Sequence, residues 1–272
     1  MSGLHSLRLG TPGAPPAVLA HCFLGNGGSW RRMLAAMAPL DALSLDLPGH
    51  GGSAMPDDPG DFHALTAAAI ALHVARPSLL VGHSFGAASM LRHALGNPAT
   101  ATGLVLIEPV FFAAARGTPA FAPYRASERA LHAAVRAGDL DVAAREFLAL
   151  NPGSPDWDAL PPPVQRQMAA QMRLVAATEA GLFGDSGGLC APGVMEGFDP
   201  PVLLMVGSDT TPIFHATANA LAQRLPRAEV VVVAGAGHMA PITHPADTAR
   251  AIDAWRRRTG QPLAETETPC VG

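Results

Sequence analysis

Short runs of apolar residues recur along the chain, and each ends at a small or polar residue. Runs of four to six residues without alternation are typical of strands buried on both faces, as in a parallel sheet. Segments with helical spacing of apolar positions separate these runs. Because strands and helices alternate, the pattern predicts an α/β fold with a doubly wound, mostly parallel sheet. The predicted strands are 17–21, 42–46, 79–83, 103–108, 202–206 and 230–234, with an alternating edge strand at 4–9; the predicted helices are 29–37, 61–75, 85–95, 214–225 and 245–258.

The alternation stops between about Val110 and Asp199, where the pattern predicts helices and no strand. Helical spacing covers residues 127–137, 139–150 and 163–177, and the connections between them are rich in Pro and Gly. An insertion of this size between two strands is expected to cover the ends of the sheet. We therefore predict a core formed by residues 1–110 and 199–258, a helical lid at 111–198, and a flexible tail at 259–272.

Composition narrows the possible functions. A length of 272 residues with 49% hydrophobic residues fits one α/β domain with an inserted lid. The net charge of −4 lacks the basic surface that non-specific nucleic-acid binding needs, so no nucleic-acid partner is expected. All 18 cationic residues are arginines, which excludes a Schiff-base lysine and a phosphate loop built on lysine.

The cysteines indicate neither a metal site nor a disulfide framework. Cys22, Cys190 and Cys270 are odd in number and far apart, so a reducing compartment is expected. The N-terminal residues contain no continuous apolar segment typical of a signal sequence, and no stretch approaches the roughly 20 apolar residues that cross a bilayer. A cytoplasmic protein without a membrane partner is therefore expected.

The strongest chemical signal is the segment Gly82-His83-Ser84-Phe85-Gly86. It follows the apolar run SLLV and precedes the helical run AASMLRHAL. A strand that turns sharply into a helix at a serine needs small flanking residues, and it exposes the serine hydroxyl above the strand end. The amide of Phe85, in the first turn of the helix, would then point to where an oxyanion forms. Ser84 is therefore the predicted nucleophile.

With this motif the chain resembles the α/β-hydrolase family, and three further segments support the resemblance in the expected order. HCFLG at 21–25 is similar to the family's oxyanion loop, DLPGHGGS at 46–53 to its DxPGxGxS loop, and GAGHMAP at 235–241 to the segment that carries its catalytic histidine. The resemblance implies that the amide of Phe23 is the second oxyanion donor and that His238 is the general base. The other histidines in motif loops, His21 and His83 among them, are expected to support the loops by hydrogen bonds.

Two carboxylates compete for the acid of the triad. The family usually places it in the loop after the strand that precedes the histidine strand, where Asp209 is the only carboxylate. That loop reads GxDxxP, which is shorter than the family's usual GxxDxxxP. Some members carry the acid one strand earlier, where Glu108 stands just before Pro109. Both choices preserve the order serine, acid, histidine, so both are retained.

One position in the oxyanion loop departs from the family. Cys22 occupies a position where the family has glycine, and we expect it to be a small buried residue rather than a reactive thiol. In the lid, Met168, Met172, Leu174 and Leu182 are expected to pack against the sheet domain rather than to line an acyl pocket.

The resemblance implies a serine hydrolase that cleaves an ester, thioester or related carbonyl compound, with no cofactor and no metal. The apolar lid favours a small or medium, largely apolar acyl substrate. A serine nucleophile argues against the dehalogenase and epoxide hydrolase branches, which need an aspartate there. The same triad also serves a menaquinone-pathway synthase, carbon–carbon bond hydrolases and cofactor-free peroxide chemistry. A cluster of lid arginines such as Arg125, Arg129 and Arg173 would favour the synthase.

A non-enzymatic ligand receptor on the same scaffold is the less favoured alternative, because Ser84 and His238 are both present.

Overall fold

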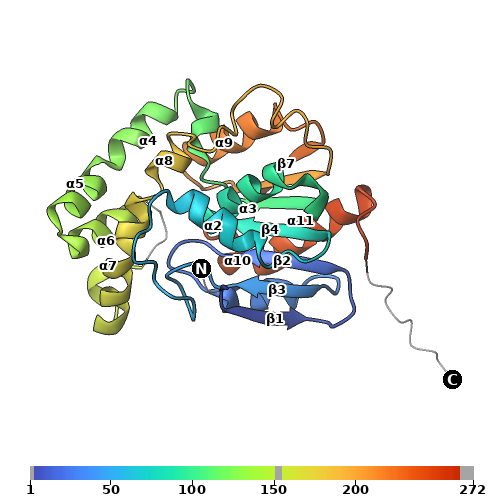
Figure 1. The fold of residues 1–272 in the computed structure, drawn as a ribbon, viewed down its shortest axis with the longest axis horizontal. Helices are drawn as coiled ribbons and strands as arrows, with labels where there is room; N and C mark the ends of the chain where they lie inside the picture. The colour runs from blue at the N-terminus through green and yellow to red at the C-terminus, as the bar shows by residue number, and fades with distance from the viewer. Residues whose placement is uncertain (1–2, 151–154, 264–272) are drawn as a thin grey trace.

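The computed structural model describes residues 3–150 and 155–263 of the chain and contains a seven-stranded sheet (Figure 1). The strand order is β1-β3-β2-β4-β5-β6-β7, with β1 antiparallel to β3 and all other pairs parallel. This architecture confirms the predicted doubly wound α/β fold. The strands are β1 (Ser6–Gly10), β2 (Pro16–Ala20), β3 (Asp41–Leu45), β4 (Ser78–His83), β5 (Ala101–Ile107), β6 (Val202–Gly207) and β7 (Ala228–Val233).

Helices cover both faces of the sheet, which is why its central strands consist of continuous apolar runs. One face carries α2 (Phe62–Ala71), α3 (Phe85–Gly96) and α9 (Pro212–Ala222). The other carries η1 (Gly27–Trp30), α1 (Arg31–Leu34), α10 (Ala240–Thr243) and α11 (Pro245–Arg258). A short 3-10 turn, η2 (Pro98–Thr100), leads into β5.

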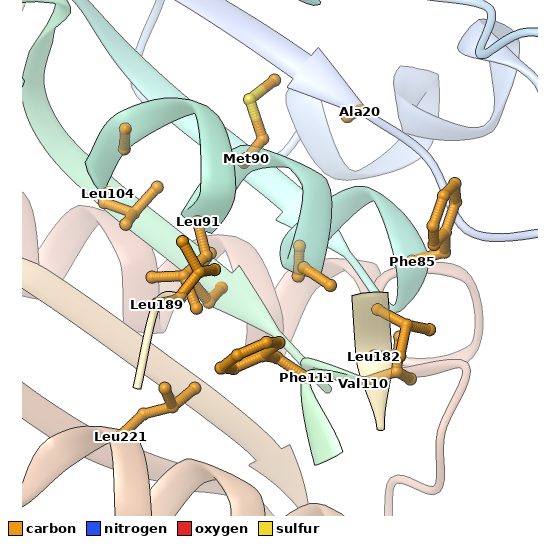
Figure 2. Packing of buried hydrophobic residues seen from close by; sticks show 14 of the residues in the cluster. Ala20, Phe85, Met90, Leu91, Leu104, Val110, Phe111, Leu182, Leu189 and Leu221 are labelled. Carbon is orange, nitrogen blue, oxygen red and sulfur yellow. The ribbon is translucent and has the colours of Figure 1, made fainter. Parts of the chain in front are cut away.

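Strand β5 illustrates how one strand serves both layers. Leu104 and Leu106 belong to the cluster under α3, whereas Val105 and Ile107 belong to the cluster under α11. All four side chains are fully buried. Figure 2 shows Leu104 in the same cluster of side chains as Met90 and Leu91 of α3. The two-residue period of a strand therefore divides one apolar run between two cores.

Strand β7 differs from the sequence-based expectation of a doubly buried strand. Its run of valines lies at the edge of the sheet, where β6 is its one strand neighbour within residues 3–150 and 155–263. Val232 is 53% exposed and four other residues of the strand are half-buried. A purely apolar run thus marks an edge strand here, because periodicity alone does not report how many neighbours a strand has.

The connection from β5 to β6 is helical, and its described residues contain no strand. Helices α5, α6 and α7 gather at one side of the sheet in Figure 1. They share a separate apolar cluster that includes Leu131, Leu148, Trp157 and Met172. The elements are η3 (Phe112–Ala115), α4 (Phe121–Ser127), α5 (Arg129–Ala137), α6 (Leu140–Ala149), η4 (Trp157–Ala159), α7 (Pro162–Ala176) and α8 (Glu179–Leu182).

The first residues of the predicted tail pack against the core. The side chain of Gln261 donates to the carbonyl of Thr102 at 2.5 Å, and Arg256 donates to the carbonyl of Pro262. Residues 264–272 of the predicted tail lie outside the described residues, as does Cys270. Across residues 3–150 and 155–263, no helix has the length and apolar character needed to cross a bilayer.

Candidate active site

Ser84 lies at a sharp turn between β4 and α3. Its backbone has φ 55° and ψ −117°, a conformation that non-glycine residues rarely adopt. The flanking glycines are required by close packing. A Cβ atom on Gly82 would lie 2.5 Å from Cα of Ala87, and one on Gly86 would lie 2.2 Å from the carbonyl oxygen of Ala20. The turn therefore depends on small residues on both sides of a strained serine.

His238 lies next to the Ser84 hydroxyl, in the loop that follows β7. Its Nε2 is 3.0 Å from Oγ of Ser84, within hydrogen-bond distance. The imidazole of His83 donates from Nε2 to the backbone carbonyl of His238 at 2.8 Å, which fixes the loop against the turn. The ring of Phe214 lies 4.5 Å from the His238 ring, centroid to centroid. These contacts hold the imidazole toward the serine.

Glu108 completes a linear arrangement with these two residues. Its Oε2 lies 3.3 Å from Nδ1 of His238, and its side chain is fully buried. Glu108 has φ 50°, so the backbone at the end of β5 is strained as it is at Ser84. The carboxylate also accepts from the amide of Gly207 at 2.6 Å and from the hydroxyl of Thr210 at 2.8 Å. These two donors compensate part of the cost of burying the carboxylate.

The structure separates the rival carboxylate, Asp209, from the histidine. Its amide donates to the carbonyl of Ala236, and its carboxylate accepts from the hydroxyl of its neighbour Ser208 at 2.7 Å. Asp209 is exposed and makes no hydrogen bond or ion pair with His238 among the described residues. The short loop after β6 therefore turns Asp209 toward solvent and brings Thr210 to Glu108 instead.

The two residues expected to supply oxyanion donors lie side by side near the serine. Phe85 is the first residue of α3, and amides in the first turn of a helix lack an intrahelical acceptor. The ring of Phe23 stacks on the ring of Phe85 with centroids 4.4 Å apart. Leu24, next in the chain, has φ 63°, which marks a tight turn after β2. The packing thus places the loop after β2 against the start of α3.

A buried hydrogen-bond network connects the loop after β2 to the loop after β3. The His21 ring donates from Nδ1 to the carbonyl of Cys22 at 2.7 Å and accepts at Nε2 from the amide of Leu47 at 3.0 Å. Asp46 accepts from the amides of Gly27 and Gly52. Burial lowers the pKa of His21 to about 3, so the ring is neutral and its two nitrogens keep distinct roles.

Cys22 is buried, as the sequence led us to expect. Its residue is 7% exposed, and burial raises the pKa of its thiol to about 12. At neutral pH the thiol is therefore fully protonated and a poor nucleophile. No feature of its surroundings supports a catalytic role.

A cavity of about 50 Å³ lies directly against Ser84 and His238. Its lining combines apolar and polar side chains. The apolar residues are Phe23, Val110, Phe112, Phe147, Val175, Leu182, Phe183 and Phe214; the polar residues besides Ser84 and His238 are Tyr124, Glu128, His132, Thr178 and Glu179. A volume of this size is well below the roughly 150 Å³ of a cavity that binds benzene, so a substrate of moderate size needs the residues around the cavity to move.

The lid residues singled out by sequence occupy different environments. Met172 lies in the separate cluster of the lid and Leu174 in the main core, whereas Leu182 lines the cavity. Among the three arginines, Arg129 and Arg173 are exposed. Arg125 forms an ion pair with Glu179, and its guanidinium lies over the ring of Phe183. The cavity lining contains no arginine among the described residues.

Sequence reasoning missed three residues of the site, Gly207, Thr210 and Glu128. The first two are hydrogen-bond donors to Glu108, and the third lines the cavity. Gly207 and Thr210 belong to the same loop segment as Asp209. The sequence therefore indicated that this segment lies near the site, but not that these two residues donate hydrogen bonds to Glu108. No group of three or more His, Cys, Asp or Glu residues is arranged to hold a metal ion in the described part of the chain.

Comparison with known proteins agrees with the architecture. A family model described as "Alpha/beta hydrolase family" matches residues 17–251. The chain is 35% identical over 101 residues to 2-succinyl-6-hydroxy-2,4-cyclohexadiene-1-carboxylate synthase of Enterobacter sp. (strain 638), an alignment that covers 36% of this chain and 39% of the synthase. It is 37% identical over 91 residues to epoxide hydrolase A of Mycobacterium tuberculosis, covering 31% of this chain and 28% of that protein.

The chain thus aligns with about two fifths or less of the length of these two curated relatives. Among solved structures, a thermophilic esterase from Thermogutta terrifontis superposes with a TM-score of 0.67 over 94% of this chain and 93% of the esterase, at 21% identity. Similarity at this level of identity indicates a shared fold and does not transfer a substrate.

Proposed function

Because the chain belongs to the alpha/beta hydrolase family, we propose that it is a serine hydrolase that cleaves an ester or thioester through an acyl-enzyme. The observation that carries this proposal is the alignment of three side chains from three different loops. Ser84 Oγ lies 3.0 Å from one nitrogen of His238, and Glu108 Oε2 lies 3.3 Å from the other. A serine, a base and a buried carboxylate in this order form the arrangement used for acyl transfer on several unrelated folds.

In the first half-reaction, Oγ of Ser84 attacks the carbonyl carbon of the substrate. Nε2 of His238 takes the hydroxyl proton, and the Glu108 carboxylate stabilises the resulting imidazolium. The carbonyl oxygen becomes an oxyanion, which the amides of Phe23 and Phe85 would bind. The tetrahedral intermediate collapses when His238 returns the proton to the leaving alcohol or thiol, leaving the acyl group on Ser84.

In the second half-reaction, water takes the place of the alcohol. His238 removes a proton from the water, whose oxygen attacks the acyl carbon. The second intermediate then expels Oγ of Ser84, which regains its proton from the imidazolium. The products are a carboxylic acid and a free enzyme in its starting protonation state, so the cycle needs no cofactor and no metal.

The cavity favours an ester that is not a dicarboxylate. Its lining contains two glutamates and, among the described residues, no arginine. The synthase alternative needs cations that receive an anionic substrate, but Arg129 and Arg173 are exposed and Arg125 is paired with Glu179. A dicarboxylate would therefore find no unpaired cation in this lining to receive its second carboxylate. The apolar remainder of the lining supports a small or medium acyl group next to Ser84.

The experiment is hydrolysis of p-nitrophenyl esters, from acetyl to octanoyl, by the wild-type protein and by Ser84→Ala. We expect turnover by the wild type with an optimum at short to medium chains, and loss of turnover in Ser84→Ala. A fluorophosphonate probe should label the wild type and not the variant. Turnover that survives in Ser84→Ala would refute the proposal, and so would a wild-type protein that neither hydrolyses any ester nor reacts with the probe.

A further inference from the structure

Glu128 is a buried carboxylate that the proposed reaction does not use. It stands at the junction of α4 and α5, lines the cavity that contains Ser84 and His238, and is 8% exposed. Its Oε2 has no hydrogen-bond partner among the described residues. A buried polar atom without a partner is costly, and native structures retain few of them. Because Glu128 also lines the cavity, a ligand bound there would lie next to this carboxyl group.

The groups around Glu128 are polar but balanced in charge. The guanidinium of Arg125 lies 3.7 Å from Oε2, and Nε2 of His132 lies 4.0 Å from it. Both distances exceed a hydrogen bond. Arg125 is also paired with Glu179, whose other oxygen lies 3.5 Å from Nδ1 of His132. Arg125 therefore interacts with two carboxylates, those of Glu128 and Glu179, and the closer contact is with Glu179.

This environment favours the uncharged form of Glu128. Burial raises its pKa to about 8, with Arg125 opposing the shift and Glu179 adding to it. Burial lowers the pKa of His132, so that ring is neutral at pH 7. The carboxyl group of Glu128 is then both a hydrogen-bond donor and an acceptor, and Arg125 and Glu179 cancel in charge. A neutral wall of this kind suits an uncharged polar group.

We propose that Glu128 is a specificity-determining residue that binds an uncharged hydroxyl or carbonyl group of the substrate, remote from the bond that Ser84 attacks. This inference rests on the proposed hydrolase function and specifies its substrate class. The apolar residues of the cavity would contact the carbon chain, and Glu128 would select chains whose far end carries such a group. A carboxylate at that end would lose its hydration without meeting an unpaired cation in the described cavity wall, and would therefore bind less well.

The test measures binding without turnover, in Ser84→Ala. Ethyl hexanoate is compared with ethyl 6-hydroxyhexanoate for the acyl side, and hexyl acetate with 6-hydroxyhexyl acetate for the alcohol side. We expect the hydroxylated ester to bind about five- to tenfold more tightly in at least one pair, the gain typical of one net hydrogen bond. Monoethyl adipate, which is anionic, and ethyl 6-aminohexanoate, which is cationic, should bind less well than the hydroxyl ester.

Substitutions at Glu128 test whether this residue causes the preference for the hydroxylated ester. Glu128→Leu should abolish it, because the side chain keeps its volume but cannot hydrogen-bond, whereas Glu128→Gln should retain it to within about threefold. Glu146→Leu, on the same helical insertion but outside the cavity lining, is the matched control and should keep the preference. Thermal unfolding of each variant verifies that it is folded.

The outcomes separate this inference from the proposed function. Equal binding within both pairs, a preference that survives Glu128→Leu, or tighter binding of the anionic or cationic ester would each overturn the role of Glu128. Hydrolysis of ethyl hexanoate by the wild type is measured separately. Glu128-dependent binding by a protein that hydrolyses no ester and does not react with the fluorophosphonate probe would refute the serine hydrolase proposal and leave the recognition role standing. Hydrolysis without Glu128-dependent binding would refute only the recognition role.

Discussion

The carboxylate of Glu108 faces the imidazole of His238, with Oε2 3.3 Å from Nδ1, although 130 residues separate them in the chain. The contact forms because β5 and the loop after β7 end at the same edge of the sheet, where sites in open α/β sheets gather. Glu108 is held there by a strained backbone and by donors from Gly207 and Thr210. The end of β6 and the loop after it, which also contains Asp209, thus supply hydrogen-bond donors to a carboxylate that follows the neighbouring strand.

Glu108→Gln should therefore damage activity far more than Asp209→Asn. The amide of glutamine cannot stabilise the imidazolium and favours the wrong tautomer, so we expect kcat on p-nitrophenyl butyrate to fall by about 10³- to 10⁴-fold. Asp209 is exposed and bonded to Ser208, so its substitution should change kcat by less than about twofold. Circular dichroism verifies folding. A larger loss in Asp209→Asn would contradict the assignment.

Gly86→Ala should destabilise the protein, because its Cβ atom would lie 2.2 Å from the carbonyl oxygen of Ala20. Backbone must shift to relieve that contact, at a cost of about 1–3 kcal/mol or more in the free energy of unfolding. Gly96→Ala, at the other end of α3, is the control, since a Cβ there meets no atom within 4 Å. It should raise stability by about 0.4–1 kcal/mol. Similar urea midpoints for the two variants would count against this packing.

Acid should destabilise the fold before the carboxylates titrate, and His63 should contribute. Burial lowers the pKa of His63 to about 4 from an ordinary value of 6.5, and its Nε2 donates to the carbonyl of Ala88. The unfolded chain binds the proton more tightly, so this stability is present above pH 6.5 and is lost as pH falls toward 4. The loss amounts to about 3 kcal/mol at most.

His63→Gln, which keeps a donor but cannot be protonated, should show a shallower decline of unfolding free energy between pH 6.5 and 4. Urea unfolding at several pH values measures both proteins. Parallel pH profiles for the wild type and the variant would show that His63 does not titrate as described.

Cys22 should resist alkylation in the folded protein. Its thiol is buried with a pKa of about 12, so iodoacetamide at pH 7.5 should leave it unmodified within an hour and modify it once urea is added. Peptide mass spectrometry locates the adducts. Cys22→Ala should keep kcat within about threefold. Rapid alkylation of Cys22 in the native state, together with loss of activity, would instead assign the thiol a functional role.

Sequence patterns predicted the sheet, the helical insertion and the turn at Ser84, because each depends on local spacing and on glycines at fixed positions. They did not distinguish Glu108 from Asp209. That choice depends on a positive φ at the end of β5 and on the length of the next loop, which place one carboxylate inward and the other in solvent. Nor did they indicate Glu128, because helical spacing within the insertion does not reveal which residues face the distant serine.

The most direct test of the central claim is to look for the acyl group on Ser84. The wild-type protein is mixed with p-nitrophenyl butyrate, quenched with acid in the first turnovers, digested and analysed by mass spectrometry. The account predicts a butyryl group on the peptide that contains Ser84, its loss on longer incubation, and no such adduct in Ser84→Ala. Steady hydrolysis with no butyryl peptide, or with the group on another residue and persisting in Ser84→Ala, would contradict it.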